Sequence, residues 1–226
     1  MEPDRLTVTY VGGPTCLVEF GGVRLLTDPT FDPAGGEYRT GPVTLRKLAG
    51  PALSPEALGP FDAVLLSHDH HADNLDHAGR RLLASAKRVL TTPEGAGRLG
   101  GNSIGLAAWQ STDLEAPGGR VLRVAATPAR HGPALLHRGP VTGFAIFFVD
   151  TPQRVVYVSG DTVWYEGIAE VARRFALRAA LLNLGAARVA VLPCHLTMTA
   201  AEAFAGVGWE ARLQWPEAGR AIEVEL

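Results

Sequence analysis

The chain has 226 residues, and 21 Lys and Arg against 23 Asp and Glu give a formal net charge of −2 at pH 7. Hydrophobic residues make up 46% and charged residues 19%. These values exclude a disordered chain, and without a basic excess we expect no nucleic-acid partner. The length suits one sizeable domain, residues 1–226.

The sequence favours a cytoplasmic protein. It contains no apolar run of the roughly 18 residues that a membrane-spanning helix needs, and residues 1–5 are polar, unlike a secretory signal. Cys16 and Cys194 are too few for a disulfide framework and suit a reducing compartment.

The first half of the chain combines short strands with long loops. Gly-rich connections too short for a crossover helix predict an antiparallel meander of three strands, residues 6–11, 16–20 and 23–27. A Pro- and Gly-rich stretch, 33–60, is typical of a long loop with a short helix around 55–58. An apolar strand, 62–66, then leads into the polar segment 67–74 and a helix over 75–87.

The second half repeats this pattern of strands and helices. A helix is expected around 165–174, and Thr199 with Glu202 forms a capping box that opens another helix. Strands are expected at 88–90, 121–125, 143–149, 155–159, 179–184 and 189–192. Strands and helices in both halves favour two packed sheets covered outside by helices. The tail, 209–226, is amphipathic and stays unassigned.

A group of histidines at the end of a strand carries the strongest chemical signal. His68, His70 and His71 fall within four residues, with Asp69 and Asp73 between and beside them. A lone histidine there would be read as part of a solvated loop. Clustered imidazoles and carboxylates are instead the donors that a divalent metal such as zinc requires.

Two later residues strengthen the metal hypothesis. His131 and Asp161 each follow an apolar strand. A buried carboxylate at position 161 without a partner would be costly, so a bound cation is the simplest explanation.

Five segments in this order resemble the metallo-β-lactamase superfamily, in particular the branch of ascorbate-6-phosphate lactonase and the N-acyl-phosphatidylethanolamine phospholipases. The segments are residues 22–29, 67–76, 129–131, 160–162 and 195–203. The resemblance implies an α/β protein with the αββα four-layer sandwich, one or two zinc ions, and hydrolysis by a metal-bound hydroxide.

The match to the family's metal loop, His-x-His-x-Asp-His, is imperfect. His68 and His70 fit its first half, but Asp73 and Asn74 fit the second half only after one inserted residue. Either His70 or His71 is therefore the second ligand. Asn74 occupies the last histidine position and is a much poorer zinc ligand.

Three further positions carry over from the resemblance. His131 matches the third ligand position, Asp161 the bridging carboxylate, and His195 a pocket histidine ahead of a helix. The family's final metal histidine lies further on, whereas no histidine follows His195 here.

These departures predict one zinc ion, with the second site weak or empty. That second site would have only Asp73, Asn74 and a share of Asp161 as metal ligands unless His195 turns inward. The first ion would keep His68, His70 or His71, His131 and Asp161. We expect Asp73 to accept a proton from the metal's water or to orient it, and His195 to polarise the substrate or protonate the leaving group. The expected partner is a small-molecule ester, lactone, amide or phosphodiester.

Two other functions compete with this hypothesis. Asn74 and the missing final histidine would also suit a degenerate family member that has lost hydrolysis and serves as a binding protein or a non-hydrolytic pathway enzyme. Ser103, within Gly101–Gly105, fits the nucleophile elbow of a serine hydrolase, but residues 92–100 before it are turn-forming, which favours a plain Gly-rich loop.

Several residues near the motifs keep two interpretations. Asp28 is expected either near the metal loop or closing a turn. Asp69 and Asp76 are expected to fix ring tautomers or to be solvated. His77 and His137 are expected at the surface, and the pocket walls are expected from 31–60 and 103–119. The oligomeric state and the substrate are left open.

Overall fold

The computed structural model describes residues 5–40, 43–135, 138–185, 195–207, 214–224 and 226. The chain groups into two compact units. The first unit comprises Met1–Gly105 and Pro216–Glu225, and the second comprises Leu106–Trp215 with Leu226. A single domain over residues 1–226 stays a prediction.

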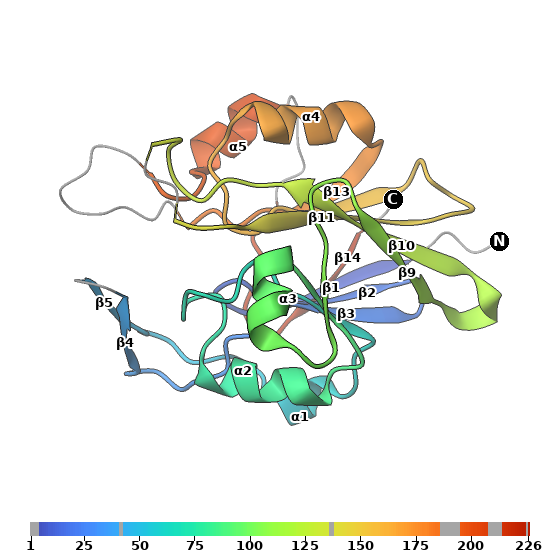
Figure 1. Ribbon diagram of the computed structural model, residues 1–226. Helices are drawn as coiled ribbons and strands as arrows, with labels where there is room; N and C mark the ends of the chain where they lie inside the picture. Colours follow the sequence, from blue (N-terminus) through green and yellow to red (C-terminus); the bar gives the residue numbers. More distant parts are fainter. Residues whose placement is uncertain (1–4, 41–42, 136–137, 186–194, 208–213, 225) are drawn as a thin grey trace. The chain divides into compact units, whose positions relative to one another are not determined.

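The first unit contains a seven-stranded sheet in the order β14-β1-β2-β3-β6-β7-β8 (Figure 1). Its strands are Leu6–Gly12 (β1), Thr15–Phe20 (β2), Val23–Thr27 (β3), Ala63–Leu65 (β6), Val89–Thr91 (β7), Ser103–Gly105 (β8) and Ala221–Val224 (β14). The antiparallel pairing of β1, β2 and β3 confirms the meander. From β3 through β8 the neighbours are parallel, so their carboxyl ends meet at one edge.

Three short helices of the first unit begin at side-chain caps. They are Pro55–Leu58 (α1), His77–Leu82 (α2) and Pro93–Leu99 (α3), and the 3₁₀ turn Leu83–Ser85 (η1) follows α2. The capping oxygens of Ser54, Asp76 and Thr92 accept backbone amide hydrogen bonds at these starts. The prediction of turn structure over 92–100 was wrong, because the Thr92 cap with Pro93 in the first turn starts a helix.

A hydrophobic core lies beneath the sheet of the first unit. Buried side chains from β1, β2, β3, β6 and β7 cluster there with those of α1 and of the segments around α2. Its buried members are Val11, Leu17, Leu26, Phe31, Leu58, Phe61, Val64, Leu66, Leu75, Leu83, Ala86 and Val89. The segment 33–60, expected as a loop, also contains a hairpin of Glu37–Thr40 (β4) and Val43–Arg46 (β5).

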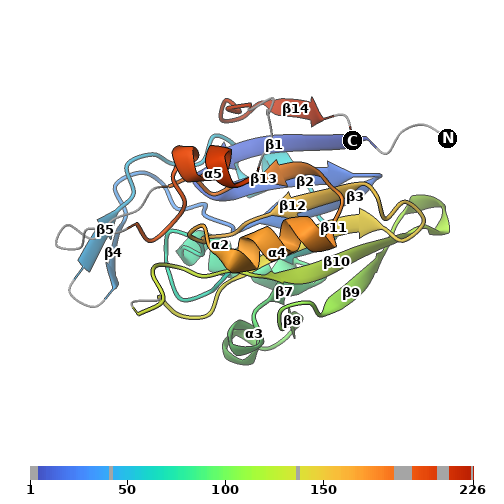
Figure 2. The same ribbon diagram turned by 90° about the horizontal axis from the view of Figure 1, so that it is seen from above.

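The second unit contains a five-stranded sheet in the order β13-β12-β11-β10-β9. Its strands are Ser111–Glu115 (β9), Val121–Pro128 (β10), Thr142–Phe148 (β11), Val155–Val158 (β12) and Leu177–Leu181 (β13), with a 3₁₀ turn Pro117–Gly119 (η2). Glu166–Arg174 (α4) covers one face of this sheet (Figures 1 and 2).

Helix α5, Ala200–Val207, begins at the expected capping box. The Glu202 backbone amide donates to Thr199 Oγ1 at 3.1 Å, and the Thr199 amide donates to Glu202 Oε2 at 2.8 Å. Each side chain thus satisfies an amide that the helix leaves open, which confirms this prediction. The expected strand 189–192 lies outside the described residues.

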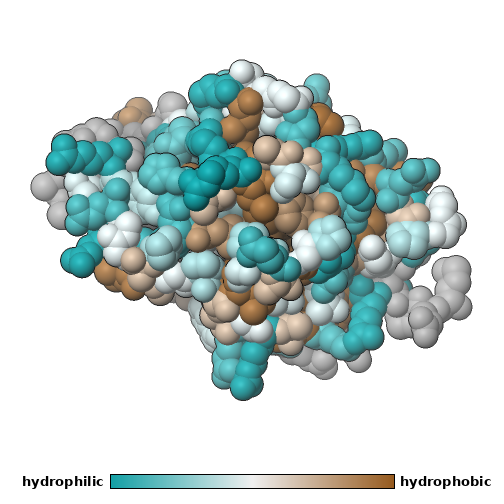
Figure 3. All heavy atoms as spheres, turned by 90° about the horizontal axis from the view of Figure 1, so that it is seen from below, coloured by the Kyte–Doolittle hydropathy of each residue, from teal (hydrophilic) through white to brown (hydrophobic). Residues whose placement is uncertain are grey.

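The surface mixes side chains of both kinds. Figure 3 shows hydrophilic residues over much of one face, interrupted by smaller hydrophobic areas, as on an ordinary protein surface. Among the helices that the structure describes, none is long and apolar enough to cross a membrane.

Replacing two helical glycines by alanine should change the free energy of unfolding in opposite directions. A Cβ on Gly79 in α2 would lie 1.8 Å from the carbonyl oxygen of Pro29, a backbone atom that cannot move aside, whereas Gly97 in α3 has open space. We expect Gly79→Ala to lower the free energy of unfolding by about 1–3 kcal/mol.

The matched control, Gly97→Ala, should raise that free energy by roughly 0.5–1 kcal/mol through helix propensity. Urea denaturation measures both variants. A Gly79→Ala protein as stable as Gly97→Ala would contradict the packing of α2 against the segment after β3.

Candidate metal centre

The histidine loop begins where the buried strand β6 ends, and a carboxylate from the neighbouring strand end holds it. The Ser67 backbone amide donates to Asp28 Oδ1 at 2.7 Å. Asp28 follows β3, is 2% exposed and has a positive φ of 26°, a region in which Asp is several-fold enriched. Asp28 therefore lies beside the histidine loop, as the first of its two interpretations expected, and follows the end of β3 in a bend.

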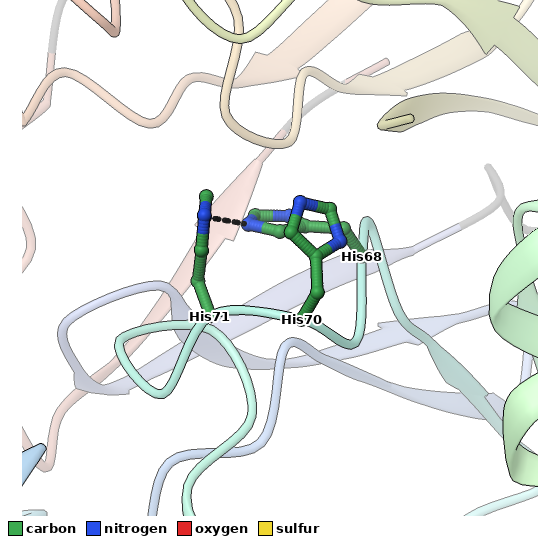
Figure 4. A group of neighbouring side chains, drawn as sticks. All are labelled: His68, His70 and His71. Carbon is green, nitrogen blue, oxygen red and sulfur yellow. Dashed lines mark hydrogen bonds between the residues drawn. The ribbon is translucent and has the colours of Figure 1, made fainter. Parts of the chain in front are cut away.

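The loop gathers three imidazoles on one side (Figure 4). The ring centroids lie 4.8 Å apart for His68 and His70, 5.0 Å for His68 and His71, and 4.4 Å for His70 and His71. One ligand atom from each ring lies within 4.8 Å of the others. The structure therefore brings both candidates for the second ligand, His70 and His71, to His68.

The spacing within this group fits a small cation. His68 Nε2 and His71 Nδ1 are 3.0 Å apart. Two nitrogen ligands of a tetrahedral zinc ion lie roughly 3.3 Å apart, since each bond is about 2.0–2.1 Å long. Small ring movements would thus exchange the contact between the rings for two metal bonds.

A chain of polar contacts orients the His68 ring. Its Nδ1 lies 2.9 Å from Ser67 Oγ, which in turn lies 3.4 Å from Asn74 Nδ2. Asn74 is buried. Asn74, which stands at the position of the family's last histidine, therefore supports the His68 ring through Ser67. In this orientation His68 Nε2 faces His71.

Asp69 is buried beside the histidines and is neutralised by an arginine. Arg98 of α3 donates two hydrogen bonds to its carboxylate, at 2.8 and 2.5 Å, and Arg80 donates to its backbone oxygen at 2.7 Å. Burial acts to raise the pKa of Asp69, but the Arg98 guanidinium outweighs it and holds the pKa below its usual value. Asp69 thus stays charged and binds α3 to the loop.

The other acidic residues of the loop lie apart from the rings. Asp73 is exposed in a turn and belongs to neither the His68, His70 and His71 group nor another described donor group of the first unit. Asp76 caps α2, accepting from Gly79 N at 2.8 Å and from Lys47 Nζ at 2.9 Å. His77 is exposed, as expected, and His137 lies outside the described residues.

A second donor pair lies within the second unit. His131 Nδ1 is 2.9 Å from the carbonyl oxygen of Leu196. Because a carbonyl only accepts, Nδ1 carries a proton and donates this hydrogen bond, so Nε2 is the ring nitrogen that could act as a metal ligand. His131 Nε2 lies 3.9 Å from Asp161 Oδ2, too far for a hydrogen bond and somewhat longer than the roughly 3.3 Å between two ligands of a tetrahedral zinc ion, so a small side-chain movement would let both bind one ion.

Two residues that support this pair were not found from the sequence. Asn183 Nδ2 donates to Asp161 Oδ1 at 3.1 Å, and Asn183 follows β13. Leu196 accepts from both His131 and the Gly132 amide through its backbone. The only sequence signals were the apolar run before Asn183 and the position of Leu196 next to His195. His195 itself is half-buried.

Neither Ser103 nor the described cysteine lies in a context that would activate a nucleophile. Ser103 begins β8 after helix α3, the reverse of the strand-to-helix order of a nucleophile elbow. Burial raises the pKa of the Cys16 thiol to about 12, which keeps it protonated and inert at neutral pH. Cys194 lies outside the described residues.

Comparisons with known proteins agree with the fold described here. The possible metal-dependent hydrolase from Veillonella parvula DSM 2008 superposes with a TM-score of 0.74 at 18% identity, covering 97% of this chain and 99% of that one. The isothiocyanate hydrolase from Delia radicum gut bacteria gives a TM-score of 0.71 at 22% identity, covering 89% and 80%. At these identities the likeness shows the fold, the metallo-β-lactamase fold.

The family follows from the sequence match. The model of the beta-lactamase superfamily domain matches residues 23–213, so the chain belongs to this family. Uncharacterized protein Rv0906 of Mycobacterium tuberculosis strain H37Rv is 30% identical over 179 residues, which cover 75% of this chain and 46% of Rv0906. The chain thus matches about half the length of that relative. The superfamily and fold predictions are confirmed. The two structures named above are an isothiocyanate hydrolase and a possible metal-dependent hydrolase, in line with the enzyme class predicted. The lactonase and phospholipase branch stays a prediction.

The Arg98–Asp69 pair should contribute stability that depends on pH. A lowered pKa stabilises the folded state fully above the ordinary carboxyl pKa of about 3.9, and this is lost as pH falls through the folded-state pKa. Arg98→Gln should therefore lower the free energy of unfolding by about 1–2 kcal/mol at pH 7 and by less near pH 3, with the value limited by the half-exposed arginine.

The control is Arg123→Gln, because the Arg123–Asp113 pair is 39% and 44% exposed and should be worth less than about 1 kcal/mol. Urea denaturation at pH 7 and near pH 3 measures the free energy of unfolding of both variants and of the native protein. An equal loss at pH 3 and pH 7 for Arg98→Gln would show that the arginine acts by packing alone.

Proposed function

We propose that this protein is a metal-dependent hydrolase of a small ester, lactone, amide or phosphodiester. The observation that supports it most is the group of His68, His70 and His71 at the carboxyl end of β6, with donor atoms within 4.8 Å of one another. Family membership supports the same conclusion. The proposed location is the cytoplasm.

The proposed metal is one zinc ion. Its ligands in the proposal are His68, one of His70 and His71, and the pair of His131 and Asp161. The tautomer of His131 and the close approach of the loop imidazoles support this donor set. When bound, such an ion activates water at neutral pH and polarises a carbonyl or phosphoryl oxygen.

The chain's own residues would orient the reaction. The hydrogen bond between His131 Nδ1 and the Leu196 carbonyl would orient the His131 ring, and the Asn183 amide would orient the Asp161 carboxylate. His195 is the proposed group that polarises the substrate or protonates the leaving group. Since Asp73 is exposed, its proposed part is limited to the proton, and Asp73→Asn should not change metal content.

Metal analysis tests the proposal directly. Protein purified with zinc and then desalted should retain about one equivalent. His68→Ala and His131→Ala should each weaken zinc affinity at least about tenfold in chelator competition, whereas His77→Ala should bind zinc as the native protein does.

The outcomes separate the candidates. About two tightly held equivalents would contradict the single-ion proposal. A metal-free protein, inert toward esters, lactones, phosphodiesters and isothiocyanates, would identify the second candidate, a family member that binds small molecules without hydrolysing them, which Asn74 favours.

Replacing Ser103 by Ala should leave hydrolysis unchanged, because Ser103 lies in a strand and not at an elbow. The kcat of the variant measures this on whichever substrate the screen identifies. A loss of roughly 10³-fold or more would identify Ser103 as the nucleophile instead.

A further inference from the structure

A cavity of about 310 Å³ adjoins the histidine group, and residues of the first unit alone line it. His70 and His71 contribute to its wall beside the metal centre. Strand β4 contributes Glu37 to Arg39, and α2 contributes His77 and Arg80. This volume suits a small metabolite or one end of a larger molecule.

The hairpin wall of the cavity is held in place by buried polar contacts. Lys47, just after β5, donates to the buried Asp76 at 2.9 Å. Tyr38 of β4 donates to Asp32 Oδ2 at 2.8 Å, and Asp32 accepts from the Ala78 amide of α2 at 2.9 Å. The hairpin is thus tied to the start of α2, and the cavity exists without a ligand.

The carboxylates of this wall already have cationic neighbours. Arg98 neutralises Asp69, and Lys47 neutralises Asp76. Glu37 stands opposite Arg46 in the hairpin register, within the distance at which cross-strand charges attract. The acidic residues therefore leave little net negative charge toward the cavity.

Two arginines of the wall have no such compensation. Arg39 and Arg80 are exposed, and among the residues described no carboxylate lies within ion-pair distance of either guanidinium. Arg80 gives one N–H to the neutral carbonyl oxygen of Asp69. A guanidinium carries five N–H donors, so both side chains retain donors for an oxyanion.

We infer that this cavity binds an anionic group of the substrate, a phosphate or carboxylate, through Arg39 and Arg80. The reacting bond then lies toward His70 and His71. The inference rests on the proposed hydrolase for the reaction, but the binding of the anion can be measured separately.

Calorimetric titration of the zinc-loaded protein with phenyl phosphate, benzoate and benzamide provides the test. The anions should bind and the neutral benzamide should bind at least about tenfold more weakly. Tighter binding of phenyl phosphate than of benzoate would indicate a substrate that carries a phosphate. Tighter binding of benzoate would indicate a substrate that carries a carboxylate.

Matched variants distinguish the arginines from the metal. Arg39→Gln and Arg80→Gln should each weaken the preferred anion about tenfold. The control Arg81→Gln, on the next position of α2, removes the same charge outside the cavity wall and should change affinity less than about twofold. Equal effects of all three substitutions would overturn the inference, as would anion binding lost only in His68→Ala.

The two proposals can fail independently. Hydrolysis with equal preference for 4-nitrophenyl butyrate and mono-4-nitrophenyl glutarate, together with unchanged anion binding in the arginine variants, would reject the anion site and keep the hydrolase. Arginine-dependent anion binding by an inactive, metal-free protein would keep the anion site and reject the hydrolase.

Discussion

The hydrogen bond from the Ser67 amide to the buried Asp28 carboxylate ties the histidine loop to the sheet. Asp28 follows β3 and Ser67 follows β6, and these strands are parallel neighbours. A carboxylate with 2% exposure is costly to bury unless its oxygens accept hydrogen bonds. That cost favours this register, because a loop in another register would remove this hydrogen bond from the buried charge.

The same constraint governs the surroundings of the proposed metal centre. Asp69 and Asp76 are both buried. Arg98 donates to the Asp69 carboxylate, and Lys47 and the Gly79 amide donate to the Asp76 carboxylate. Their charges are therefore committed to the scaffold. In the proposal, the three imidazoles of the loop supply the nitrogen donors for a cation. The short loop thus combines carboxylates that hold the scaffold with the imidazoles that are proposed to bind metal.

The family places this chain on a fold that serves many reactions, so the substrate has to be argued from the site. The sequence departs from the family pattern in the histidine loop, where Asn74 stands in place of a histidine and one residue is inserted, and after His195, where the final histidine is missing. The side chains that would select a substrate come from the hairpin β4–β5 and from α2. Lys47 and Tyr38 hold this hairpin against α2 through the buried carboxylates of Asp76 and Asp32.

Local patterns were sufficient for the meander β1–β2–β3, the capping box before α5 and the histidine group, because each depends on neighbours within a few residues. They also carried the family resemblance. Helix α3 and the hairpin β4–β5 escaped prediction, since Gly and Pro are equally compatible with turns. The partners of the site came from the tertiary structure alone: Asp28 for Ser67, Arg98 for Asp69, Leu196 for His131 and Asn183 for Asp161. Each joins residues more than twenty positions apart, and such pairs form only when the strands align.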